Sequence, residues 1–63
     1  MQYGVIQIKD NDVKVLEICN SKEAVLVAEQ VHKRNHDSRE GFVTAVRAEF
    51  VDGQLKENKF SIL

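Results

Sequence analysis

The sequence has no proline, three glycines and a single cysteine, Cys19. The lack of proline argues against disorder of the proline-rich kind. One cysteine excludes a disulfide within the chain and fits a reducing compartment. No apolar run approaches the ~18–20 residues that cross a membrane, and residues 1–10 lack the charged start and long apolar stretch of a secretory signal. We therefore expect a cytoplasmic protein that does not enter the membrane.

The chain also has no excess of charge of either sign. Nine Lys and Arg residues against ten Asp and Glu residues give a net charge of −1. Nucleic-acid binding rests on several uncompensated Lys or Arg contacts with phosphates, and polybasic segments bind anionic membranes. This charge balance therefore argues against both nucleic acid and an anionic membrane surface as partners.

What remains is the composition of an ordinary globular domain, with 43% hydrophobic and 30% charged residues. A chain of 63 residues predicts a single domain, residues 1–63. Its own core leaves a stability of only ~3–5 kcal/mol. Small chains usually add a disulfide, a metal or a partner subunit, and the first of these is excluded within one chain.

The first half of the chain predicts a hairpin followed by a helix. Residues 2–9 and 13–19 are rich in β-favouring side chains, and the intervening Asp10-Asn11-Asp12 is a turn sequence. Asn20 or Ser21 is expected to cap a helix that runs through about residue 36. The apolar stripe expected to face inward consists of Ala24, Val27, Ala28 and Val31.

The second half predicts another hairpin, with strands at residues 42–51 and 54–63 joined by a tight Asp52-Gly53 turn. Such a turn sets the register, which would be Phe50 opposite Leu55, Glu49 opposite Lys56, Ala45 opposite Phe60 and Val43 opposite Ile62. The order is therefore ββαββ. We expect an α+β domain in which one helix packs on one face of a four-stranded antiparallel sheet.

Both faces of this sheet are expected to carry large apolar side chains, whereas a half-exposed strand normally alternates apolar with polar residues. In the first hairpin, Ile6 and Ile8 alternate with Tyr3 and Val5, and Leu16 and Ile18 alternate with Val13 and Val15. In the second, one face would carry Phe42, Val46, Phe50, Leu55 and Leu63, and the other Val43, Ala45, Phe60 and Ile62. One short helix can cover only one of these faces.

The uncovered second face predicts a partner, most simply a second copy of the chain. The leading hypothesis is a non-enzymatic protein–protein interaction module that forms a homodimer through this face. Face-to-face packing, edge-to-edge pairing and exchange of a hairpin are all open. A monomer is the alternative, with long side chains such as Lys59 and Arg47 folded over apolar atoms. The candidate interface residues are Leu26, Phe42, Val46, Phe50, Leu55 and Leu63.

The runner-up function is a small nucleic-acid-associated protein that uses the basic end of the helix. Lys33, Arg34 and Arg39 would touch phosphates, although Asp37 and Glu40 partly cancel their charge. No aromatic residues are interleaved for base stacking, and we expect nucleic acid to be an unlikely partner.

No catalytic, cofactor or substrate site is expected. His32 and His36 have a spacing that can hold a metal, but a metal site needs three or four converging ligands. Cys19 lies near the helix start, and a helix rise of ~1.5 Å per residue would put both histidines about 20 Å away. A buried apolar thiol is therefore the expected role of Cys19.

Three segments resemble small uncharacterised ββαββ proteins of bacteria, phages or mobile elements. They are Tyr3-Gly4-Val5-Ile6, the helix start Asn20-Ser21-Lys22-Glu23-Ala24, and the hairpin from Ala48-Glu49-Phe50 to Asp52-Gly53. The resemblance covers most of the chain, but it consists of strand, cap and turn residues. It implies a compact domain in a bacterial cytoplasm and carries no site residue with it.

Overall fold

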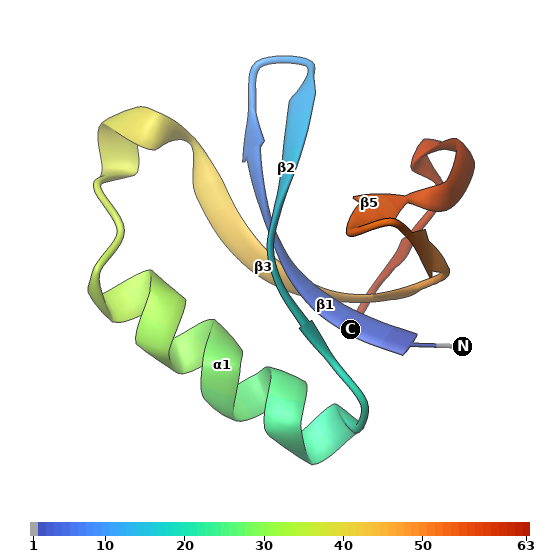
Figure 1. Ribbon diagram of the computed structural model, residues 1–63. Helices are drawn as coiled ribbons and strands as arrows, with labels where there is room; N and C mark the ends of the chain where they lie inside the picture. Colours follow the sequence, from blue (N-terminus) through green and yellow to red (C-terminus); the bar gives the residue numbers. More distant parts are fainter. Residues whose placement is uncertain (1) are drawn as a thin grey trace.

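The computed structural model describes residues 2–63 and confirms the α+β architecture. A four-stranded antiparallel sheet has the order β2-β1-β3-β6, and one helix connects β2 to β3 (Figure 1). A second, two-stranded sheet pairs β4 with β5. The elements are β1 (Gln2–Lys9), β2 (Asp12–Cys19), α1 (Lys22–Arg34), β3 (Phe42–Ala48), β4 (Phe50–Val51), β5 (Gln54–Leu55) and β6 (Ser61–Ile62), with 3₁₀ turns at Ser38–Glu40 and Lys56–Asn58.

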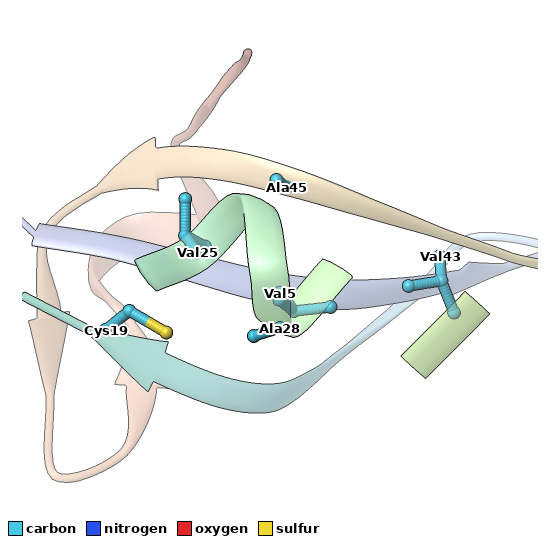
Figure 2. Packing of buried hydrophobic residues seen from close by; sticks show 6 residues of the cluster. All are labelled: Val5, Cys19, Val25, Ala28, Val43 and Ala45. Carbon is cyan, nitrogen blue, oxygen red and sulfur yellow. The ribbon is translucent and has the colours of Figure 1, made fainter. Parts of the chain in front are cut away.

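Helix α1 begins at a side-chain cap, because the Ser21 hydroxyl accepts the Ala24 N–H at 3.1 Å. Its cap at the other end is Asn35, whose side-chain amide donates to the Val31 carbonyl at 3.1 Å. Val25 and Ala28 are the buried residues of the helix. They pack with Val5, Cys19, Val43 and Ala45 in the core between helix and sheet (Figure 2).

The predicted inward stripe of the helix is wrong by part of a turn. Val27 is 67% exposed and Val31 49% exposed, so both point away from the sheet. Two polar contacts fix the observed rotation. The Glu29 carboxylate accepts the backbone N–H of Ala45 in β3, and His32 pairs with Glu17 of β2. The helix therefore turns these longer side chains toward the sheet on either flank.

A bulge in β2 changes which side chains share a face. Val5 pairs with Glu17, but the next residue, Ile6, pairs with Val15, so Leu16 is an extra residue. Leu16 packs against the core under the helix. The predicted alternation of Leu16 and Ile18 with Val13 and Val15 is therefore wrong, because the bulge places Val13, Val15 and Ile18 together on the opposite face.

The second hairpin follows the prediction close to its turn and departs from it beyond. Phe50 pairs with Leu55 as expected, and the Glu49 carbonyl accepts the Lys56 N–H at 3.0 Å. Further along, Val46 pairs with Ile62, where the predicted register would place Lys59. The cause is the 3₁₀ turn at Lys56–Asn58, in which Glu57 and Asn58 have positive φ angles of 57° and 55°. The expected pairs of Ala45 with Phe60 and of Val43 with Ile62 are therefore wrong.

The chain bends after β3, and the β4–β5 hairpin folds over the face of the sheet opposite α1 (Figure 1). Phe50 of the hairpin lies close to Gly4, where an added Cβ would lie 2.5 Å from Cζ of Phe50. Ile6 and Val46 on this face are fully buried. No helix in the described chain has the length and apolar character needed to cross a membrane.

Candidate functional site

The face of the four-stranded sheet opposite α1, called the second face from here on, carries no charged side chain among the strand residues of the described chain. The pairing register arranges its side chains in four rows across the strands. In order along the sheet, the rows are Val13–Ile8–Phe42, Val15–Ile6–Thr44, Ile18–Gly4–Val46–Ile62 and Gln2–Ala48.

The charged side chains of the same four strands all lie on the side that faces the helix. They are Lys9, Asp12, Lys14, Glu17 and Arg47. This is the reverse of an ordinary half-exposed antiparallel sheet, where polar residues occupy the face without a helix. Because burial of an unpaired charge is costly, a face without charge can be covered by a partner at low desolvation cost.

The β4–β5 hairpin covers one end of the second face and leaves the other end open. Phe50 lies against Gly4 in the third row, and Ile6 in the second row is fully buried. The first row, Val13–Ile8–Phe42, is called the open row. Its Val13 and Ile8 are partly exposed, and Phe42 is 54% exposed. A strip of apolar surface therefore crosses three strands at the open end.

The predicted interface residues divide between this surface and the rest of the molecule. Phe42 lies in the open row, whereas Val46 is fully buried and Phe50 pairs with Leu55 inside the hairpin. The sequence could not show that the hairpin folds back and uses its own apolar side chains. What it did show was the surplus of apolar residues, of which the open row and the 61% exposed Ile62 stay uncovered on the second face.

Leu26 and Leu63 are exposed, but they belong to the helix side. The N–H of Leu63 donates to the Ala45 carbonyl at 3.1 Å, opposite a residue of the helix-facing core. Leu26 lies one helical turn before Glu29, whose carboxylate binds the N–H of the same Ala45. These two residues therefore form no continuous surface with Phe42.

Two of the three cations expected to contact nucleic acid are paired with carboxylates. Lys33 lies 3.4 Å from Glu29, and Arg39 lies 2.9 Å from Asp37. The Arg39 side chain and backbone N–H groups bond to Asp37, and these contacts lower the pKa of its carboxyl group. The basic helix end is therefore mostly neutralised by its own neighbours.

Cys19, Glu17 and His32 come together on the helix-facing side of β2. The Cys19 thiol lies 3.9 Å from one Glu17 oxygen, and the His32 Nε2 lies 2.9 Å from the other. The expected wide separation of Cys19 and His32 is therefore wrong, because α1 runs back along β2 and brings His32 to Glu17. Once Val25 and Ala28 mark the inward side, a helical period also places His32 there.

The chemistry of this trio is not that of an activated nucleophile. Burial, and after it the negative charge of Glu17, raises the pKa of the Cys19 thiol. The carboxylate stands between thiol and imidazole, whereas a catalytic cysteine is activated by an imidazole beside the sulfur. Cys19 is therefore a protonated, buried thiol at neutral pH.

The two histidines do not converge on a common point. His32 contacts Glu17, and the Nε2 of His36 lies 2.9 Å from the Gly41 carbonyl in the loop before β3. Within residues 2–63 no three His, Cys, Asp or Glu side chains are grouped in a way that could hold a metal ion.

An open groove of about 400 Å³ lies where the second hairpin departs from the predicted register. Ligand pockets are mostly apolar with a few placed polar groups. This lining is mainly charged, and two of its ion pairs, Lys56–Glu49 and Lys59–Glu57, are internal at 3.4 Å and 3.2 Å. The lining residues are Arg47, Ala48, Glu49, Lys56, Glu57, Lys59, Phe60 and Ser61.

The open row is therefore an uncharged apolar strip whose chemistry favours a contact. Comparison with known proteins finds no relative of this chain. No protein-family model matches the chain, and neither a search of curated proteins nor a search of solved structures finds a match.

Proposed function

We propose that this protein is a non-enzymatic interaction module that self-associates through the open end of its second face. The observation that carries the proposal is the distribution of charge across the sheet. Every charged strand residue of the described chain faces the helix side, while the open row presents Val13, Ile8 and Phe42 to the surroundings. A cytoplasmic location is part of the proposal, because the single free thiol of Cys19 suits a reducing compartment.

A second copy of the same chain is the occupant that fits this surface. A two-fold axis through the open row would set one uncharged apolar strip against another, so neither copy would have to desolvate an unpaired charge. The strip covers much less than the ~800 Å² per partner of a standard stable interface. We therefore expect a weak dimer, with a dissociation constant on the order of 0.1–1 mM.

The test compares two substitutions at equally exposed apolar residues. Phe42 in the open row and Val51 in the β4–β5 hairpin are both 54% exposed. Phe42→Lys places a charge in the proposed contact, and Val51→Lys places the same charge outside it. Sedimentation equilibrium over a concentration series should show association that resists salt in the parent chain and in Val51→Lys, and at least about tenfold weaker association in Phe42→Lys.

Circular dichroism of both variants establishes that each is folded. A parent chain that stays at 7.2 kDa up to millimolar concentration would overturn the proposal. Equal weakening by the two lysine substitutions would also contradict it. The nucleic-acid alternative predicts another outcome, namely retention on DNA or RNA at low salt that falls steeply as salt increases.

A further inference from the structure

The outward side of α1 carries an apolar ridge, called the outer ridge, which consists of Ala24, Val27 and Val31. All three are exposed, and Val27 has a larger exposed fraction than Val31 or Leu26. Their spacing of three and four residues aligns them along one side of the helix. The neighbouring side of the helix, about a quarter turn away, carries Val25 and Ala28 and is buried against the sheet. The helix therefore has a second apolar stripe that the described chain does not cover.

Two opposite charges flank this ridge at its ends. Glu23 lies in the first turn of α1 and Arg34 in the last, and both are exposed. Among the ion pairs of the described chain, neither residue has a partner. They are separated by just over three full turns at ~3.6 residues per turn, so they lie on the same flank, about 16 Å apart along the axis.

We propose that a second copy of this chain docks on the outer ridge, with the two α1 helices antiparallel across a two-fold axis. In the register that sets Glu23 beside Arg34 of the second copy, Val27 lies beside Val31 of that copy. Two-fold symmetry makes each of these contacts twice. The antiparallel arrangement also brings together helix ends of opposite partial charge.

The charges select this arrangement over a parallel one. A parallel pair related by a two-fold axis along the helices would put the flank that carries Glu23 and Arg34 on opposite sides of the contact in the two copies, so neither charge would have an opposite charge beside it. The apolar ridge supplies the contact surface, while the two charges determine the direction in which the copies meet. A helix of 13 residues is about 20 Å long, so this contact is small and weak compared with a standard interface.

The helix contact does not depend on the open row, because the two surfaces lie on opposite faces of the sheet. The two together would let association continue beyond a dimer. The test is therefore made in chains that carry Phe42→Lys, which removes the sheet contact and leaves the helix contact to be measured alone. Val27→Lys in this background should leave a monomer of 7.2 kDa.

Charge reversal gives the sharper experiment. Glu23→Arg and Arg34→Glu, each alone, replace both attractive pairs with repulsive ones and should weaken association roughly tenfold. The double variant Glu23→Arg/Arg34→Glu restores attraction and should recover the affinity of the background chain. An equimolar mixture of the two single variants should associate more tightly than either variant alone, because every facing pair is then of opposite charge.

Circular dichroism and thermal unfolding of each variant identify losses that come from misfolding. A double variant that is folded but stays as weak as the single variants would overturn the antiparallel contact. So would a mixture that behaves as the average of its components, or a Phe42→Lys chain that remains monomeric at millimolar concentration. None of these results would contradict the proposal for the second face, which is tested separately with the parent chain and Val51→Lys.

Discussion

The ring of Phe50 lies directly on the backbone of Gly4, on the face of the sheet that α1 does not cover. A Cβ built on Gly4 would lie 2.5 Å from Cζ of Phe50 and 3.2 Å from the Glu17 carbonyl oxygen. Glycine at this position in the second strand from the edge is therefore what lets the hairpin come close. This contact places the C-terminal hairpin against the third row of the second face and leaves the open row uncovered.

We predict that Gly4→Ala destabilises the fold by about 1–3 kcal/mol, because the added methyl group overpacks the contact. Displacement of the ring would also expose Ile6 and Val46. The expected result is a lower urea midpoint and increased binding of a fluorescent apolar dye. A matched double-mutant cycle with Phe50→Ala gives the control, since Gly4→Ala should cost much less once the ring is absent. Additive costs would mean that the two residues are not in contact.

Local patterns in the sequence were sufficient to predict the order of the main elements. The turn residues around Asn11, the cap at Ser21 and the Asp52-Gly53 hairpin are determined within a few positions of the chain. The register near Asp52-Gly53 was therefore correct, with Phe50 opposite Leu55. The 3₁₀ turn that follows was not predictable. It places Glu57 in a left-handed conformation, and the sequence has no glycine at this position to indicate one.

The rotation of α1 shows why the candidate surface was only partly predictable. Apolar spacing predicted an inward stripe that contains Val27 and Val31, and both of these are exposed. The observed one is fixed by contacts of Glu29 and His32 with the strands, which depend on tertiary structure. The surplus of apolar residues was readable from the sequence, but its division between hairpin, open row and outer ridge was not.

The N-terminal cap of α1 gives a prediction in which the adjacent residue serves as the control. The sequence left open whether Asn20 or Ser21 caps α1, and the structure has the Ser21 hydroxyl bonded to the Ala24 N–H. Ser21→Ala should therefore lower the free energy of unfolding by about 1 kcal/mol. Asn20→Ala should change it by less than ~0.5 kcal/mol, as for an ordinary surface substitution. Denaturant unfolding of the two variants measures the difference, and a larger loss for Asn20→Ala would contradict the assigned cap.

Cys19 should react slowly with thiol reagents in the folded protein. Burial and the neighbouring Glu17 raise the pKa of its thiol, so the reactive thiolate is scarce near neutral pH. Labelling by iodoacetamide, followed by mass spectrometry, should be at least about tenfold slower in the native chain than in urea. A raised pKa stabilises the folded state below the unfolded thiol's pKa, and that stabilisation is lost as pH rises through the folded value.

Glu17→Gln tests the electrostatic part of this effect. Removal of the negative charge should lower the pKa of Cys19 and move the rise in labelling rate to lower pH, while burial still slows the reaction. The Glu40→Gln variant, which alters an exposed partner of Lys9, is the control and should leave the labelling profile unchanged. Native labelling as fast as labelling in urea would show that the thiol is accessible.

The Glu29 carboxylate binds a backbone group of the sheet as well as a neighbour on the helix. It accepts the Ala45 N–H at 2.9 Å and lies 3.4 Å from Lys33, and its side chain is 14% exposed. The Ala45 carbonyl accepts the Leu63 N–H just past the end of β6, whereas the Ala45 N–H is bonded to the Glu29 carboxylate and not to a strand. We predict that Glu29→Ala costs about 1–3 kcal/mol, because it leaves a partly buried donor without its charged acceptor.

The measurement is hydrogen exchange of the Ala45 amide together with denaturant unfolding. Protection of that amide should fall in Glu29→Ala more than protection of β1 amides, because the effect is local to the β3 edge. Glu40→Ala is the control, since its exposed pair with Lys9 should contribute less than ~1 kcal/mol. Equal costs for the two glutamates, with Ala45 still protected, would mean that the carboxylate does not hold the helix to the sheet. If Glu29 does hold α1 there, its loss should also shift the outer ridge, so Glu29→Ala should weaken the helix contact without changing any residue in it.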